Sequence, residues 1–187
     1  VDNGCTDQSP AIAHSLNARV IQELNRGYGN AVRCGIKNAK GTYTILSDCD
    51  TTYNLENLSS FLDKLRMGYV LVVGNRFAGG IAHSAMPFTH RYLGIPFLSW
   101  LGRKRYKVDL TDFHCGLRGF NSKEAKKLNL KSEGMEFATE LIACFANTSL
   151  PIAEVPTTLS VSKHPRHSHL RTIRDGFHLA LIEIGNH

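Results

Sequence analysis

The sequence contains no run of about 20 consecutive apolar residues, so it predicts no transmembrane helix. It contains no CxxC pair, and its five cysteines are scattered and odd in number, which disfavours a zinc ribbon or a disulfide framework. Free thiols in a reducing cytosol are the expected state of these cysteines. Low-complexity tracts, repeats and linkers are also missing, so the 187 residues predict one globular domain.

An initiator methionine and a signal peptide are absent as well. Val1 stands where the methionine of a complete chain would stand, which predicts a fragment of a longer protein.

Positive charge exceeds negative charge by six, and the sequence pI is about 9.2. This balance suits phosphates, nucleic acid or an acidic membrane surface, without choosing among them. The C-terminal part gathers Lys163, Arg166, Arg171 and Arg174. A single-strand nucleic-acid module would interleave aromatic residues with such a tract, and residues 163–176 contain none, so no nucleic-acid partner is expected.

Strand-length apolar runs alternate with helical patterns, which predicts βαβ units and a mostly parallel sheet. Strands are expected over residues 18–24, 42–46, 69–75 and 113–121, with an edge strand over 151–159. Helices are expected after a Ser9 cap, over 31–39, from an Asn54 cap to Gly68, around 92–101 with a kink at Pro96, over 134–147 and over 168–184.

Two aspartates follow the run YTIL, where a buried strand should end. Residues i and i+2 of an extended segment point to the same side, so Asp48 and Asp50 can converge on one ion. Paired carboxylates with open positions suit Mg²⁺ or Mn²⁺, whose other ligands are water and substrate phosphates. The alternative interpretation is an acidic turn without a metal.

Six short motifs occur in one order along the chain: VDNGCTDQS, RGYGNA, DCD, VVGNR, DFHCGLRGF and EFATEL. Together they resemble glycosyltransferase family 2, and within it the branch of dolichyl- and polyprenyl-phosphate sugar synthases, of the dolichyl-phosphate mannose synthase type. The resemblance implies an α/β fold of the GT-A type, a nucleotide-diphospho-sugar transferase fold with a mostly parallel sheet flanked by helices. The family's first strand has no counterpart before VDNG, so residues 1–187 are expected to form a single GT-A-like catalytic domain that is incomplete at its N-terminus.

The resemblance implies a donor site and a metal site. Nucleotide or donor binding is assigned to Asp2, Gly4, Arg26, Gly29 and Asp48, and metal binding to Asp48 and Asp50 with Mg²⁺ or Mn²⁺. Thr52 stands where this branch often has a glutamine, which leaves the third protein ligand open. For Asp2 and Gly29, a turn-forming aspartate and a plain helix-entry glycine are the alternatives.

The resemblance also implies catalytic and acceptor groups. Asp112 is a candidate base and Arg76 a candidate partner of the leaving diphosphate. Acceptor or phosphate binding is assigned to Arg91, Arg118, Lys163, Arg166 and Arg171. The alternatives are a capping aspartate and solvated basic side chains.

Three further polar residues lie near these motifs. His114 is expected to be hydrogen-bonded within its loop rather than bound to a metal. Glu136 and Glu140 share one helix face, which borders either the acceptor cleft or solvent.

The reaction implied is an inverting transfer of glucose or mannose from a UDP- or GDP-linked donor to a polyprenyl or dolichyl phosphate. A lipid phosphate is largely ionised at neutral pH and needs cations more than a base. A saccharide hydroxyl, the alternative acceptor, would need a base such as Asp112. An inactive nucleotide-binding domain is a third interpretation. The expected location is the cytosolic face of a membrane, with a peripheral contact through the basic C-terminal residues.

Overall fold

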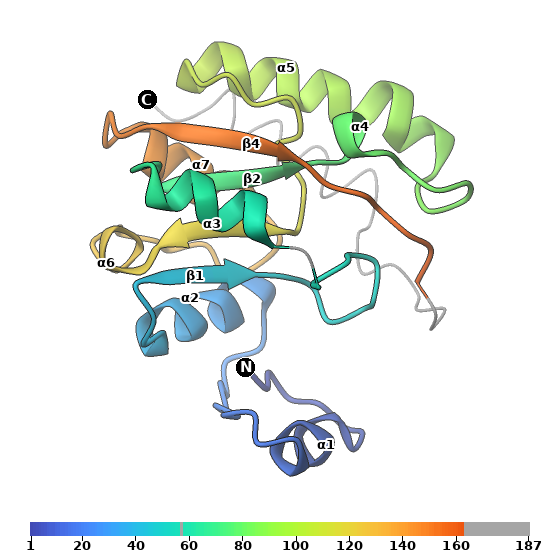
Figure 1. The fold of residues 1–187 in the computed structure, drawn as a ribbon. Coiled ribbons are helices and arrows are strands. Elements are labelled where there is room, and N and C mark those ends of the chain that lie inside the picture. The colour runs from blue at the N-terminus through green and yellow to red at the C-terminus, as the bar shows by residue number, and fades with distance from the viewer. Residues whose placement is uncertain (57, 163–187) are drawn as a thin grey trace.

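A four-stranded sheet forms the centre of the computed structural model, which describes residues 1–56 and 58–162 (Figure 1). The strands are β1 (Tyr43–Leu46), β2 (Leu71–Asn75), β3 (Arg118–Asn121) and β4 (Ile152–Pro156), arranged in the order β1-β3-β2-β4. β3 is antiparallel to both of its neighbours, whereas β2 and β4 are parallel. β1, β2 and β4 therefore run in one direction, which confirms the predicted mostly parallel sheet.

One edge of this sheet collects the segments with candidate functional residues. β1, β2 and β4 all end there, because they run in the same direction. The antiparallel strand β3 begins there, so the loop that precedes it reaches the same edge. Residues 47–52, 76–80, 112–117 and 157–159 consequently meet at what we call the carboxyl edge, which is where ligands bind in open α/β sheets.

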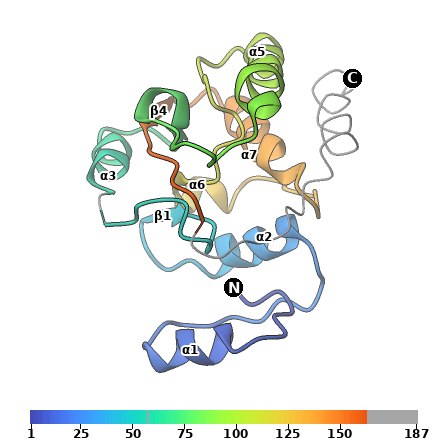
Figure 2. The ribbon, with the colours of Figure 1, turned by 90° about the vertical axis from the view of Figure 1, so that its right-hand side faces the viewer.

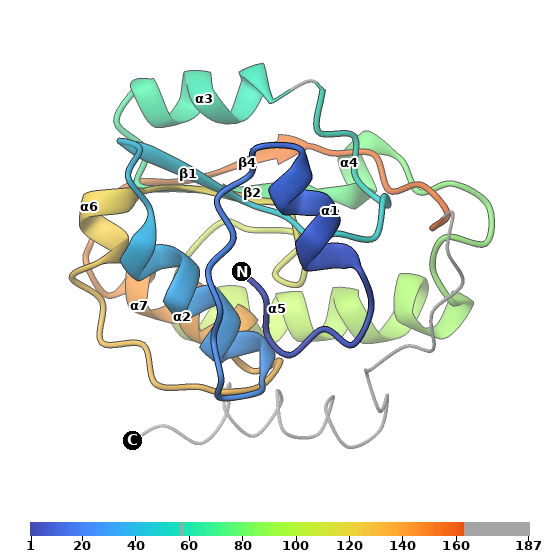
Figure 3. The same cartoon turned by 90° about the horizontal axis from the view of Figure 1, so that it is seen from below.

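Helices cover both faces of the sheet (Figure 3). α3 (Ser59–Arg66) lies on one face, and α2 (Tyr28–Asn38), α5 (Ile95–Tyr106) and α7 (Phe137–Ala146) lie on the other. The shorter helices are α1 (Ser9–Ser15), α4 (Arg76–Gly79), α6 (Ser122–Ala125) and the π-helical turn η1 (His90–Gly94). α1 lies beyond α2, away from the sheet (Figure 2).

The hydrophobic core is built around β2, all of whose residues are buried. This agrees with the predicted apolar run, which is typical of a strand that is covered on both faces. Phe61 and Leu65 of α3 and Phe137 and Phe145 of α7 are among the core side chains, each at most 2% exposed. Burying a side chain of this size stabilises a fold by about 1.5–3 kcal/mol.

Three local predictions in the N-terminal part are wrong. The strand over residues 18–24 is replaced by an isolated bridge, because Ile21 and Glu23 exchange backbone hydrogen bonds only with Asp2. Ser9 is the first residue of α1 and not its cap, since Asp7 accepts the hydrogen bond from the Ser9 amide. α3 begins at Ser59, because the Asn54 side chain binds the amide of Glu56 in a local turn instead of capping the helix.

Pro96 lies inside a continuous helical stretch, because residues 88–106 are helical without a break and the Ile95 amide, just before the proline, donates to the His90 carbonyl. The irregularity that the sequence predicts at Pro96 takes the form of the π turn η1 immediately before it, since proline supplies no amide to continue the α-helical hydrogen bonds.

No helix in the described part of the chain is both long enough and apolar enough to cross a membrane. The predicted helix over residues 168–184 and the basic candidates Lys163, Arg166 and Arg171 lie outside the described residues.

Candidate active site

The loop that follows β1 carries the predicted metal ligands to the carboxyl edge. Asp50 Oδ1 accepts hydrogen bonds from the Thr52 amide at 3.1 Å and from Thr52 Oγ1 at 2.6 Å. Thr51 between them has a left-handed φ of 62°. Ser162 Oγ donates to the Asp50 carbonyl at 2.9 Å, which ties the chain after β4 to this loop.

Gly116 makes room for the Asp48 carboxylate. A Cβ atom on Gly116 would overlap Asp48 Oδ2, so only glycine leaves that oxygen in place. The buried Tyr53 holds this glycine, since its hydroxyl accepts a hydrogen bond from the Gly116 amide at 3.0 Å. The sequence interpretation missed both residues, and an aromatic residue three positions after Asp50 was the available signal for Tyr53.

The Asp48 carboxylate lies in an environment that disfavours its own charge. Burial raises its pKa above the ordinary value, the neighbouring Asp50 raises it further, and the cations of Arg118 and Arg76 offset part of the shift. Two carboxylates that repel each other are a fitting donor set for a divalent cation. Among the residues that the structure describes, no third His, Cys, Asp or Glu joins them, so water and phosphate oxygens would complete the coordination.

Asp112 and Arg76 form a buried ion pair at the same edge. Arg76 Nε donates to Asp112 Oδ2 at 2.6 Å, and Nη2 donates to Oδ1 at 2.7 Å. The Arg76 amide adds a third hydrogen bond to Oδ2 at 3.1 Å. Burial alone would lower the pKa of Arg76, but its bonds to Asp112 outweigh that effect and raise it.

This pair corrects two predicted roles. Both carboxylate oxygens of Asp112 are engaged and its side chain is fully buried, so it is not positioned as a base. The Arg76 guanidinium is bound to Asp112, and its side chain is only 10% exposed, so it is not presented to a diphosphate.

Glu154 of β4 fixes the position of this pair, and the sequence interpretation missed it. Its Oε1 accepts from the amides of Thr111 and Asp112 at 2.5 and 2.8 Å, and its Oε2 accepts from Asn75 Nδ2 at 2.9 Å. The loop before β3 is thereby fastened to the ends of β2 and β4. A glutamate inside an apolar edge strand was the signal for this role.

Arg118 is structural, which corrects its predicted contact with a phosphate. Its side chain is almost completely buried, and Nε, Nη2 and Nη1 donate to the backbone carbonyls of Cys115, Phe113 and Ala138 at 2.9, 2.8 and 2.5 Å. The arginine therefore holds the 112–117 loop against α7.

His114 also differs from its prediction. Both ring nitrogens are buried, and neither has a hydrogen-bond partner in the described part of the chain, although a local hydrogen bond was expected. Burial lowers the pKa of His114 to about 4, and the charge of Arg118 contributes to the shift. The imidazole is therefore neutral at physiological pH.

The N-terminal residues lie against the turn that precedes α2. Both segments contain residues that the sequence analysis assigned to the donor site. Asp2 Oδ1 accepts from the amides of Gly4 and Cys5 at 3.1 and 2.9 Å, which matches the turn-forming alternative and lowers the pKa of Asp2. Gly4 has a φ of 84°, and a Cβ atom added there would lie 3.1 Å from Nε of Arg26. Asn3 Oδ1 accepts from the Gly27 amide at 2.8 Å, so the two segments form one surface.

Gly29 approaches the protein's own chain, which corrects its predicted approach to the nucleotide. A Cβ atom there would overlap the Ser132 carbonyl, and its amide donates to the Glu133 carbonyl at 2.8 Å. The start of α2 is therefore covered by the 132–133 segment.

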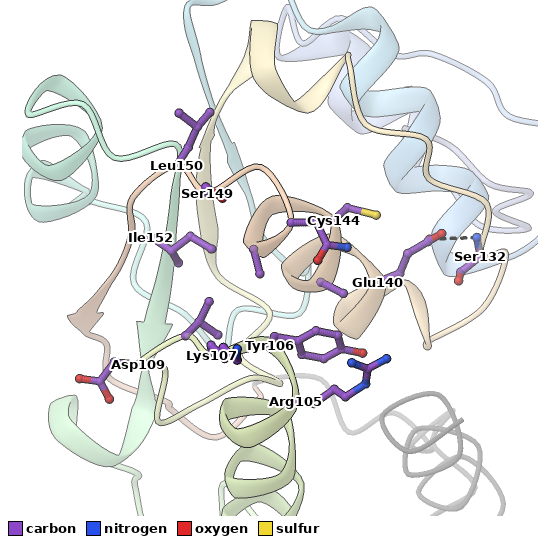
Figure 4. Close-up of a pocket in the computed structure, with 14 residues that line it drawn as sticks. Arg105, Tyr106, Lys107, Asp109, Ser132, Glu140, Cys144, Ser149, Leu150 and Ile152 are labelled. Carbon is purple, nitrogen blue, oxygen red and sulfur yellow. Dashed lines mark hydrogen bonds between the residues drawn. The ribbon is translucent and has the colours of Figure 1, made fainter. Parts of the chain in front are cut away.

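Glu140 supports that same segment. Its two carboxylate oxygens accept from the amides of Lys131 and Ser132 at 2.7 and 2.9 Å (Figure 4). Glu136, expected beside it, accepts from the Gly134 amide at 2.9 Å. Both glutamates thus hold local backbone while staying partly exposed, and whether their face borders the acceptor stays a prediction.

The remaining described candidate, Arg91, lies in η1 and is half-buried, with its guanidinium over the Tyr92 ring at 5.4 Å. A cavity of about 950 Å³ lies elsewhere, lined by Tyr106, Glu140, Cys144 and Ile152 (Figure 4). Because Ile152 begins β4, this cavity opens at the edge of the sheet opposite to Asp48.

Comparison with known families decides the classification. The family model described as Glycosyl transferase family 2 matches residues 1–128. The chain belongs to this family. The resemblance to glycosyltransferase family 2 that the motifs predict is therefore confirmed.

Curated relatives of this family-2 domain include two proteins of Haloferax volcanii. The low-salt glycan biosynthesis hexosyltransferase Agl6 is 33% identical over 180 residues, which are 95% of this chain and 43% of that protein. The dolichyl-phosphate hexose transferase is 31% identical over 154 residues, which are 82% of this chain and 66% of that protein. The chain thus spans about half the length of these relatives.

A solved structure with the same fold is the glucosyl-3-phosphoglycerate synthase from Mycobacterium tuberculosis, in complex with Mn²⁺, uridine diphosphate and phosphoglyceric acid. The TM-score is 0.71 at 19% identity, and the match covers 99% of this chain and 66% of that chain. At this identity the likeness shows the fold alone, and it confirms the predicted GT-A type.

Proposed function

We propose that this domain transfers a hexose, glucose or mannose, from a nucleoside-diphosphate donor to a polyprenyl or dolichyl phosphate, with inversion at the anomeric carbon. The observation that supports this most is the Asp48–Asp50 pair at the carboxyl edge of a family-2 domain. The named activity of the dolichyl-phosphate hexose transferase relative supports the choice of acceptor.

Asp48 and Asp50 would hold a Mg²⁺ or Mn²⁺ ion, which when bound neutralises the charge that grows on the leaving diphosphate. Gly116 and Tyr53 keep Asp48 directed at that position. The surface formed by Asp2, Gly4 and Arg26 is the proposed contact for the nucleotide.

The ion pair of Asp112 supports a phosphate acceptor over a saccharide hydroxyl. A hydroxyl nucleophile needs a base, and the Asp112 carboxylate is fully engaged by Arg76. A phosphomonoester is already largely ionised at neutral pH, because its second pKa is about 6. It requires cations that bind it, for which Arg91, Lys163, Arg166 and Arg171 are the proposed groups.

Isothermal titration calorimetry tests the donor site. UDP-glucose and GDP-mannose are titrated into the chain with Mn²⁺, without it, and into the Asp50→Asn variant with Mn²⁺. We expect one of the two donors to bind only with the metal, and Asp50→Asn to abolish that binding. The matched control is Asp63→Asn, because this exposed aspartate pairs with Arg66 of the same helix, α3.

Absence of binding by either donor, in a chain that circular dichroism shows to be folded, would contradict the proposal. The acceptor is tested separately by comparing a short polyprenyl phosphate with an oligosaccharide as substrates. Transfer to the oligosaccharide alone would favour the saccharide hydroxyl as acceptor.

A further inference from the structure

Large apolar side chains are exposed side by side along η1 and α5. Phe88, Tyr92, Leu93, Phe97 and Trp100 are between 49% and 71% exposed, and we call them the aromatic face. Two pairs of rings are in contact within it, Phe88 with Tyr92 at 4.6 Å and Phe97 with Trp100 at 6.1 Å between centroids. α5 lies at the outer margin of the molecule beyond β4, so this face is not covered by the sheet (Figure 1).

The π turn aligns the two halves of this face. In a straight α-helix, Phe88 and Trp100 would be about a third of a turn out of register, because 12 residues make roughly 3.3 turns. A π turn has i→i+5 hydrogen bonds and winds less per residue, so the five residues of η1 bring Phe88 back toward the side of Trp100. π turns of this kind are frequent at functional sites.

The charges along the segment that carries the aromatic face have one sign. From residue 64 to residue 108 the sequence contains no aspartate or glutamate. Arg91, Arg103, Lys104, Arg105 and Lys107 lie within or directly after η1 and α5. The Lys104 ammonium lies 5.6 Å from the centre of the Trp100 ring, so basic and aromatic groups share the surface.

We propose that the aromatic face docks on an anionic lipid surface. Aromatic rings with polar edges favour the boundary between lipid headgroups and acyl chains, and each basic residue near an anionic leaflet adds about 1 kcal/mol. A helix that lies in this plane combines an apolar face with flanking Lys and Arg residues. The sequence interpretation placed the membrane contact on the C-terminal basic residues, whereas this surface lies on η1 and α5.

Charge argues for lipid over the other occupants of an exposed apolar face. A second copy of the chain would bring the same basic residues against one another, because a two-fold interface pairs a surface with itself. Residues 163–187 carry four basic and two acidic side chains, so their net charge has the same sign as this surface. Lipid phosphates supply the opposite charge.

The buried side of α5 connects the aromatic face to the candidate active site. Ser99 Oγ accepts a hydrogen bond from the Phe113 amide at 3.2 Å, and the Phe113 ring packs where a side chain on Gly102 would lie. Phe113 follows Asp112, so docking would hold the 112–117 loop next to the lipid. That consequence rests on the proposed function, whereas the docking itself does not.

Trp100 is the sole tryptophan of the chain and reports on docking directly. Its fluorescence is measured with vesicles of phosphatidylcholine alone and with vesicles that contain 30% phosphatidylglycerol. We expect acrylamide to quench Trp100 freely without vesicles. With anionic vesicles we expect a blue shift and at least a twofold loss of quenching, both of which added salt weakens.

Vesicle co-sedimentation of variants locates the contact. Phe97→Glu and Tyr92→Glu should each weaken partitioning onto anionic vesicles by about tenfold, because each places a charge where apolar contact is needed. Met67→Glu is the matched control, since Met67 is 70% exposed at the end of α3 and away from the aromatic face. It should bind vesicles like the wild type.

Three results would overturn the docking proposal. Trp100 protected from acrylamide before vesicles are added would mean that other residues of this chain cover it. Light scattering without vesicles could show that the wild type self-associates and that Phe97→Glu does not. In that case a second copy of the chain, and not lipid, would cover the aromatic face. Equal partitioning of Phe97→Glu, Met67→Glu and wild type would place the lipid contact elsewhere. Donor binding measured on Phe97→Glu by calorimetry keeps a failure of docking distinct from a failure of the proposed function.

Discussion

Two aspartates at the carboxyl edge have opposite environments. Asp112 is fully buried and receives three hydrogen bonds from Arg76, in addition to the bonds through which Glu154 holds its backbone. Asp48 is half-buried, lies next to a second carboxylate, and has a raised pKa. The sequence places both in short polar loops, and only the arrangement of partners distinguishes them.

The comparison separates a charge that stabilises the fold from a charge that the folded environment disfavours. A buried carboxylate with a complete set of partners is part of the architecture, because its removal leaves the facing cation buried without a counter-charge. A carboxylate whose ionised form is disfavoured by its surroundings is a candidate for ligand binding, because a bound cation can compensate for that cost.

The largest effect on stability is expected from Asp112→Asn. The substitution leaves the Arg76 guanidinium buried without its counter-charge, and breaking such a pair typically costs about 3–5 kcal/mol. Urea denaturation at pH 7, followed by circular dichroism, should show this loss in the free energy of unfolding.

Asp48→Asn is the chemically identical control at the other site. It should leave the free energy of unfolding unchanged or slightly raised, because it removes the charge that burial and Asp50 disfavour. Metal-dependent donor binding should be lost in this variant. An equal loss of stability in both variants would show that the two aspartates contribute equally to the free energy of unfolding, which would contradict the comparison.

A smaller effect, confined to low pH, is expected from His114. Its pKa of about 4 lies below the ordinary value of 6.5, so the unfolded chain takes up this proton first as the pH falls. The free energy of unfolding should therefore decrease between pH 6.5 and pH 4, by about 2 kcal/mol at pH 5 relative to pH 7. The measurement is urea denaturation at both pH values.

His114→Gln isolates this contribution from the carboxylates, which titrate in the same range. The decrease between pH 7 and pH 5 should be smaller in the variant by that amount. Equal decreases in wild type and variant would mean that His114 keeps an ordinary pKa in the fold.

A still smaller loss of stability is expected from Gly116→Ala. The new methyl group displaces the Asp48 carboxylate, which can rotate away, so the cost should be about 1 kcal/mol, while metal-dependent donor binding should fall much more. Calorimetry and urea denaturation on the same sample separate the two effects.

Gly35→Ala in α2 is the matched control, since a methyl group there makes only an ordinary contact with Val1. This helix-interior change should stabilise the chain by about 0.5–1 kcal/mol and leave donor binding intact. Unchanged donor binding in Gly116→Ala would remove the role that we assign to Gly116.

The sequence predicted the strands and helices of the core because their patterns are local. The apolar run of β2 and the four-residue spacing of Phe137, Leu141 and Phe145 in α7 depend only on near neighbours in the chain. The mostly parallel sheet followed from the alternation of strands and helices. The antiparallel direction of β3 has no local pattern, and the sequence interpretation did not include it.

The sequence predicted where the candidate site lies, but not which residues its charged side chains bind. Asp48 and Asp50 follow a strand, which the sequence shows directly. The engagement of Asp112 by Arg76, and of Arg118 by three carbonyl groups, depends on residues up to 36 positions apart. The orphaned ring nitrogens of His114 likewise result from tertiary burial, which no motif describes.

The pairing of β3 has a consequence for how the protein acquires its site. β3 pairs with β1 from Tyr43↔Asn121 to Leu46↔Arg118, and with β2 from Leu71↔Phe120, so it joins segments that are distant in sequence. Such non-local contacts form slowly, because a long loop must close before they stabilise anything. The 112–117 loop leads directly into β3, so we expect the carboxyl edge to be completed late in folding. A ligand of this edge would therefore select fully folded chains and act as a stabiliser during maturation.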